Sequence, residues 1–356
     1  MFRQVLAYVG EERPDALVIA GDIYDRAVPG VEAVRLFDDF LTDLAGENVT
    51  VIIISGNHDS PERTSFASRL LADKKLFLYG RFDGTVHKVS LPDEYGEVHF
   101  WLLPFIKPLS VRPFFAGREP ESYGEALSAV LENAGIDHAE RNVLVSHQYY
   151  TKAGVRAERS ESELDPVGGL DAIDSGPVER FDYVALGHLH GAQSAGAPHV
   201  RYAGSPLKYS FSECLHEKSA SLIAIKEKGD LEIRTLPFKP LQDMRIIKGK
   251  LENLLREAAS GPADPDDYVR AILLDEEEIV DPMGKLRGAY PNIMSLDFEN
   301  SRTGIDVGTI FANEETAEEL SPYRLFRQFF LETQGSAMSA EQEEIVQEIF
   351  QIGEEE

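Results

Sequence analysis

The sequence predicts an α/β protein in which short buried strands alternate with amphipathic helices. Apolar runs at 17–20, 51–54 and 183–186 lack polar alternation, which is typical of strands covered on both faces. Each run is followed within two residues by a glycine and then by Asp, Asn or His. Because ligands collect at the carboxyl ends of parallel strands, we expect these polar side chains to converge in space.

The first half of the chain is predicted to alternate between strands and helices. A helix over 2–12 precedes the strand at 17–20, and apolar residues at helical spacing predict a second helix over 31–44. After the strand at 51–54 we expect a helix over 62–72, a strand-rich region over 76–103, a basic and proline-rich loop over 104–120 and a helix over 122–134. A strand at 143–145, a mobile loop over 151–174 and the strand at 183–186 complete this part.

Composition restricts the possible partners. The 356 residues are 43% apolar, enough for a sizeable core and an accessory unit. Asp and Glu number 62 against 35 Lys and Arg, which gives a formal charge of −27. This charge is unfavourable for binding a polyanion, so a phosphate substrate would need bound cations, a local basic patch or a partner. No apolar run approaches the roughly 20 residues of a membrane span, and there is a single cysteine, so we expect a cytoplasmic protein without membrane contact.

The polar residues after the strands form a candidate metal centre. Oxygen and imidazole donors without thiolate suit Mn²⁺, iron or Zn²⁺. A carboxylate that bridges two ions roughly 3.5 to 4 Å apart would clamp a phosphate and activate water for hydrolysis. We expect His58 to be the general acid, while Asp25, His87 and His99 are expected to be structural or turn residues. The candidate metal ligands are Asp22, Asn57, His147, His188 and His190.

Three motifs carry a family resemblance. Gly21-Asp22-Ile23-Tyr24-Asp25, Gly56-Asn57-His58-Asp59 and Gly187-His188-Leu189-His190 resemble, in order, the signature of the calcineurin-like metallophosphoesterases. Taken alone, the second motif is also compatible with an ordinary surface turn. Longer stretches are similar to the SbcD-type nucleases of this family, namely 21–29, 57–62, 183–190 and 201–213.

The resemblance implies a layered β-sandwich flanked by helices and a manganese-dependent DNA exonuclease and endonuclease. It implies that Asp22 bridges two Mn²⁺ ions, that Asn57, His147 and His188 complete one of them, and that His190 serves the other. The implied partners are DNA and an SbcC-type coiled-coil ATPase, in a heterotetramer, with a homodimer also possible.

One family motif is absent from this sequence. The family begins with a strand that carries Asp-x-His, yet none of the nine histidines has Asp two positions before it. Only Asp22 and His190 would then remain as protein ligands of the second ion, so we expect this ion to bind weakly or not at all. We also expect exposed apolar surface beside the sheet and a true start upstream of Met1.

The sequence predicts four segments. Residues 1–240 form the nuclease domain without its first strand, 241–298 a small α+β capping domain, 299–320 an acidic linker and 321–356 a helical segment that docks on the ATPase. Two other functions stay open: a phosphoesterase acting on small phosphodiesters or phosphoproteins, and a non-catalytic truncated subunit that only binds DNA ends or its partner.

Overall fold

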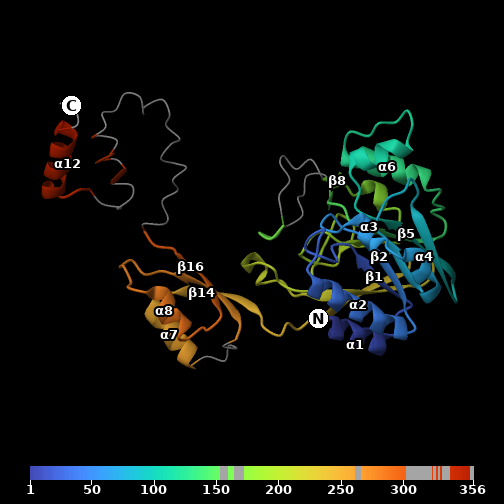
Figure 1. Cartoon of the computed structure of the whole chain (residues 1–356), viewed down its shortest axis with the longest axis horizontal. Helices are drawn as coiled ribbons and strands as arrows, with labels where there is room; N and C mark the ends of the chain where they lie inside the picture. The colour runs from blue at the N-terminus through green and yellow to red at the C-terminus, as the bar shows by residue number, and fades with distance from the viewer. Residues whose placement is uncertain are drawn as a thin grey trace. The chain divides into compact units, whose positions relative to one another are not determined.

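Figure 1 shows the chain as a computed structural model. The structure describes residues 1–152, 159–163, 172–260, 266–301, 323, 326–327, 329–330 and 337–352. The chain divides into two compact units, Met1–Leu241 and Gln242–Glu356. Within the described ranges, no helix combines the length and the apolar character that crossing a membrane requires.

Sheet A of the first unit is parallel and carries two long helices on its outer face. Its strand order is β1-β2-β3, with bounds Ala16–Ala20, Thr50–Ile54 and Leu76–Tyr79. The helices are α1 (Phe2–Glu12) and α2 (Val31–Gly46), drawn in blue in Figure 1. Phe37, Phe40 and Leu44 recur at helical spacing on α2 and are buried against this face. All of β2 is buried, whereas the edge strand β1 is half-buried throughout, so its apolar residues are partly accessible.

Sheet B has six strands in the order β10-β11-β9-β6-β5-β4. Strands β11, β9, β6 and β5 are parallel, and β10 and β4 are antiparallel to their neighbours. Helix α6 (Tyr123–Asn133) covers the outer face with Ala126, Leu127 and Val130. In the sheet order, the strand bounds are Gln193–Ser194, Val200–Tyr202, Tyr183–Leu186, Arg141–Ser146, Gly96–Leu103 and His87–Asp93.

The two sheets pack face to face. Ile52 and Ile54 of sheet A contribute to one buried cluster with Leu102, Val143 and Val145 of sheet B. The antiparallel hairpin β12 (Ser219–Ile225) and β13 (Leu231–Pro237) adds partly buried residues to the same cluster. The expected α/β sandwich with flanking helices is therefore confirmed.

The chain after β2 differs from the expected helix over 62–72. It forms three short turns, α3 (Pro61–Thr64), α4 (Ser68–Leu71) and the 3-10 turn η1 (Ala72–Lys74). Ala67 lies between them at φ 58°, in the left-handed region, which interrupts a continuous helix. The loop over 104–120 contains α5 (Pro108–Val111) and η2 (Arg112–Phe114). Most of the loop expected over 151–174 lies outside the described residues; its ends pair as β7 (Tyr150–Thr151) and β8 (Ile173–Asp174).

The second unit contains a parallel sheet of order β14-β15-β16. Leu254, Ala271 and Leu286 lie in its core, which joins the sheet to two helices. The elements are β14 (Met244–Gly249), α7 (Leu251–Ser260), β15 (Tyr268–Leu273), α8 (Pro282–Arg287), β16 (Ile293–Phe298) and α12 (Ala340–Ile352). The linker expected over 299–320 and the helix start expected at 321–322 lie almost wholly outside the described residues.

Candidate metal centre

Four of the predicted metal ligands converge at the ends of β1, β2, β6 and β9. Ligand atoms of Asp22, His147 and His188 lie within 4.8 Å of one another. Asp22 Oδ2 is 3.0 Å from His147 Nε2. The amide oxygen of Asn57 is 3.1 Å from the same nitrogen and 2.9 Å from Nδ1 of His188. Two oxygen and two nitrogen donors thus point at one position, and we call these four residues the ligand cluster.

Glycines make this close approach possible. A Cβ at Gly21 would lie 2.3 Å from His147 Nδ1, and one at Gly56 would lie 2.1 Å from Asp22 Oδ1. A Cβ at Gly187 would meet the carbonyl oxygen of Ala20 at 1.9 Å. All three separations are far below van der Waals contact, so only glycine fits before Asp22, Asn57 and His188, whereas Ser146 precedes His147.

The backbone is strained at two of the ligands. Asp22 has φ 51° and His188 has φ 99°, a region that residues with a side chain seldom adopt. Such conformations persist only where surrounding contacts impose them, and they concentrate at functional sites. Strain at two members of the ligand cluster therefore favours a functional role for it.

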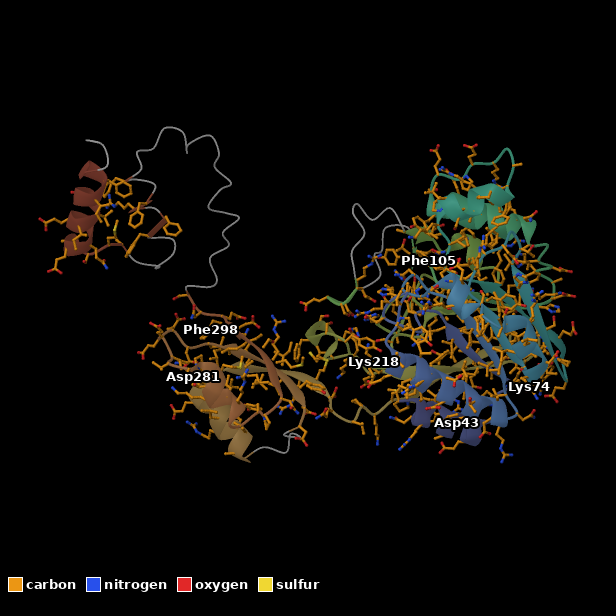
Figure 2. The ribbon with its side chains drawn as sticks, viewed as in Figure 1. Asp43, Lys74, Phe105, Lys218, Asp281 and Phe298 are labelled. Carbon is orange, nitrogen blue, oxygen red and sulfur yellow. The ribbon has the colours of Figure 1, made fainter. Side chains whose placement is uncertain are left out.

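His147 is held in the orientation of a metal ligand. It is fully buried, and its Nδ1–H donates to the carbonyl of Ala20 at 2.6 Å, which leaves Nε2 facing the cluster. Phe105, labelled in Figure 2, packs edge-on against the imidazole with ring centroids 6.3 Å apart. A backbone acceptor on the far nitrogen is a usual way to fix a metal-binding histidine.

The electrostatics favour the deprotonated forms of Asp22 and His188. Burial alone would raise the pKa of Asp22, but the hydrogen bond and charge of His147 outweigh it and hold this pKa at about 2. Burial, together with the neighbouring His147, lowers the pKa of His188 to about 3. The carboxylate is therefore ionised and the His188 imidazole neutral near pH 7.

His58 and His190 lie beside the cluster but make other contacts. The backbone N–H of His58 donates to Asp22 Oδ1 at 3.0 Å, and its ring Nδ1–H donates to the carbonyl of Asp25 at 2.8 Å. His190, two residues after His188, is not among the converging ligand atoms; its Nδ1 is 3.2 Å from Oε1 of Glu213. The histidines expected to be structural, His87 and His99, hydrogen-bond to other side chains instead.

Asp59 has a role that was not predicted from the sequence. Its side chain is 5% exposed and accepts three backbone N–H groups, from Ile23 at 3.1 Å, Tyr24 at 3.0 Å and Gly56 at 2.9 Å. Hydrogen bonds from both turns to one carboxylate thereby hold the turn of Asp22 beside the turn of Asn57. Asp59 is the last residue of the second family motif, but the sequence does not show that it contacts the turn of Asp22, and Asp is common in turns.

Replacing Asp59 with Asn is expected to loosen both turns. The amide would present N–H groups to backbone donors, which should cost about 1–3 kcal/mol in unfolding free energy. Metal binding should weaken by about 10- to 100-fold, because the turns support two ligands. Urea unfolding and calorimetric Mn²⁺ titration measure the two effects. Asp43→Asn, an exposed change on α2, is the control and is expected to leave both unchanged. If Asp59→Asn had the wild-type unfolding free energy and the wild-type Mn²⁺ affinity, Asp59 would not be the residue that holds the two turns together.

Basic side chains line a cavity next to His190. The cavity has a volume of about 570 Å³, and Arg159, Arg201 and Lys218 lie in its wall; Lys218 is labelled in Figure 2. The guanidinium of Arg159 lies 3.8 Å above the ring of Tyr149, whose centroid is 6.1 Å from that of His188. Two arginines thus lie beside the ligand cluster, whereas the charge of Lys218 is compensated by its ion pair with Glu213 and Glu217 also lies in the cavity wall.

Family models match two parts of the chain. The calcineurin-like phosphoesterase family model matches residues 1–192, which include the whole ligand cluster. The chain belongs to the calcineurin-like phosphoesterase family. Residues 240–334 match a second family model, described as type 5 capsule protein repressor C-terminal domain. Together with the relative below, these matches confirm the expected SbcD-type member of the family and its class of reaction, phosphodiester hydrolysis.

Two named proteins are similar to the chain. The SbcD subunit of the nuclease SbcCD from Staphylococcus epidermidis (strain ATCC 12228 / FDA PCI 1200) is 33% identical over 296 residues, which cover 82% of this chain and 77% of the relative. The solved structure of phosphopantetheinyl hydrolase (PptH) from Mycobacterium tuberculosis is 16% identical, with a TM-score of 0.33, over 53% of this chain and 78% of that one.

Family membership implies divalent metals, and the residues present fit them. The cluster offers one carboxylate, one amide oxygen and two imidazole nitrogens, a set that suits borderline divalent ions. Metal binding by imidazole requires an unprotonated ring nitrogen that faces the ion. The hydrogen bond at Nδ1 of His147 directs its Nε2 toward the cluster, and His188 is neutral.

Proposed function

We propose that this chain is the nuclease subunit of an SbcCD-type complex, which hydrolyses DNA phosphodiesters with Mn²⁺. The proposal includes exonuclease action on duplex ends and endonuclease action on hairpins or single strands. The observation that carries it is the convergence of four donor atoms from four strand ends. The 33% identical relative, which is named a nuclease subunit, supports DNA as the substrate.

Each residue has a distinct part in the proposed reaction. Asp22, Asn57, His147 and His188 would hold one ion, and Asp22 with His190 would serve a second. Bound divalent ions polarise the phosphate and lower the pKa of a bound water. His58 donates a proton from Nε2 to the leaving oxygen, because its Nδ1–H is engaged by the carbonyl of Asp25. Asp59 keeps the turns of Asp22 and Asn57 at a fixed separation.

The basic cavity offers a way for an acidic protein to hold DNA. With a net charge of −27, the surface as a whole repels a polyanion. Arg159 and Arg201 provide a local exception next to His190. We propose that this cavity receives the backbone next to the scissile phosphate, while the partner supplies further basic surface.

We further propose that residues 321–356 dock on an SbcC-type ATPase. The described part of this segment includes α12, on which Ile345 is 58% and Ile349 61% exposed. Phe329 is 53% exposed. Apolar side chains at this spacing on a short helix suit a groove on a partner protein.

Hydrolysis by the full-length chain tests the function. End-labelled duplex, hairpin and single-stranded DNA, together with a bis(p-nitrophenyl) phosphodiester, are incubated with Mn²⁺, with and without the ATPase partner. We expect DNA cleavage that needs Mn²⁺, stops on chelation and increases with the partner. Hydrolysis of the small phosphodiester without cleavage of any DNA, in both conditions, would contradict the nuclease assignment.

A further inference from the structure

We infer that Arg159 binds the phosphate group that the ligand cluster receives, through the oxygens that are not esterified. The inference rests on the proposed function only in placing a phosphodiester at the ligand cluster, and not in the choice of DNA. Arg159 belongs to none of the three sequence motifs and follows no predicted strand. It begins the described segment 159–163, which we call the strap.

The guanidinium of Arg159 stacks on a buried aromatic ring beside the ligand cluster. Its Cζ lies 3.8 Å from the ring centroid of Tyr149. Tyr149 is 7% exposed, belongs to the buried cluster that α6 covers and follows the ligand His147 by two residues. Its ring centroid is 6.1 Å from that of His188. The chain that follows β6 therefore carries both a metal ligand and the surface on which the arginine stacks.

This stacking suits the arginine to a phosphate group. The ring contacts the flat face of the guanidinium, whereas the N–H donors lie in the plane of that group. The planar fork matches two oxygens of a phosphate, and hydrogen bonds that involve an ionised group are about twice as strong as neutral ones. Arg159 also lies in the cavity wall with His190, two residues after the ligand His188. A phosphate group at the ligand cluster would therefore lie beside the guanidinium.

Hydrogen bonds fix the strap to the 3-10 turn η5 (Phe211–Glu213). The backbone N–H of Glu161 donates to Ser212 Oγ at 2.9 Å. The hydroxyl of Ser162 donates to Oε1 of Glu213, which is fully buried, at 2.7 Å. A side chain on a fixed backbone loses less conformational entropy on binding than one on an unattached loop. These contacts therefore favour a binding role for the arginine that the strap carries.

Phosphate binding by the full-length chain tests this contact without requiring turnover. The chain is titrated calorimetrically with inorganic phosphate, with and without Mn²⁺. With Mn²⁺, we expect Arg159→Gln to weaken phosphate binding by about 10- to 100-fold, the usual effect of losing hydrogen bonds between charged groups. Without Mn²⁺, the same change should alter phosphate binding by less than about threefold, because the phosphate is then no longer held at the ligand cluster. Mn²⁺ affinity should not change, because Arg159 is not a metal ligand.

Arg118→Gln is the control, because it changes a half-exposed arginine paired with Glu132 and should leave phosphate binding unchanged. If Arg159→Gln does not fold, Arg159→Met keeps an unbranched side chain over Tyr149 and is expected to give the same loss. Wild-type phosphate affinity in these variants, an equal loss with and without Mn²⁺, or a wild-type chain that binds no phosphate would overturn the inference. A chain that binds phosphate as expected but cleaves no DNA would refute the nuclease function alone.

Discussion

Replacing Asp22 with Asn is expected to weaken Mn²⁺ binding by at least about 100-fold and to abolish measurable DNA hydrolysis. Loss of a residue that only supports a ligand costs about 10- to 100-fold in affinity, so loss of a ligand should cost no less. Asn keeps the shape of the side chain but removes the negative charge that faces His147 Nε2 at 3.0 Å. Calorimetric titration and cleavage of end-labelled duplex DNA measure the two effects.

Asp43→Asn is the control for this change as well. It removes one carboxylate from the exposed surface of α2 and is expected to leave Mn²⁺ affinity and cleavage at wild-type values. If Asp22→Asn bound Mn²⁺ as tightly as this control, Asp22 would not be a ligand, and the ligand cluster would have to be interpreted as a structural hydrogen-bond network.

Replacing His58 with Gln is expected to lower the rate of DNA cleavage by about 10²- to 10⁴-fold, the usual contribution of a general acid. Metal affinity should stay within twofold of wild type, because the backbone N–H that contacts Asp22 is retained. Single-turnover cleavage at saturating Mn²⁺ gives the rate, and calorimetry gives the affinity.

The leaving group distinguishes proton donation from a role in binding. A p-nitrophenolate leaving group needs no proton, so hydrolysis of a p-nitrophenyl phosphodiester should fall much less than DNA cleavage in His58→Gln. His87→Gln, which changes a histidine paired with Asp83, is the control and should affect neither substrate. An equal fall for both substrates would count against His58 as the acid.

The main features of the site could be predicted because they depend on short-range patterns. Each turn has a polar residue after a buried apolar strand, with a glycine between them in three of the four turns, and the parallel strands of one sheet bring such turns to one edge. The rule accounts for the pair Asp22 and Asn57 in sheet A and for the pair His147 and His188 in sheet B, and the packing of the two sheets brings the pairs together. The rule also explains why Gly21, Gly56 and Gly187 precede three of the turns.

The parts that were missed depend on contacts between distant segments. Asp59 acts on backbone groups 35 and 36 positions earlier in the chain, and Glu213 contacts a hydroxyl 51 positions away. Asp59 stands in the second motif after the buried strand β2, but the local sequence does not show that its carboxylate contacts the turn of Asp22. Glu213 lies in a 3-10 turn and has no local signal of its own. The helix expected over 62–72 was wrong for a related reason: apolar spacing predicted a continuous helix, but Ala67 adopts a left-handed conformation.

The ligand cluster is divided equally between the two layers of the sandwich. Asp22 and Asn57 follow strands of sheet A, whereas His147 and His188 follow strands of sheet B. An ion held by all four residues is therefore a cross-link between the two sheets at one end of the core. Filling the site to about 100 times its dissociation constant adds about 2.7 kcal/mol to folding. Separation of the layers and release of the ion thus become a single coupled event.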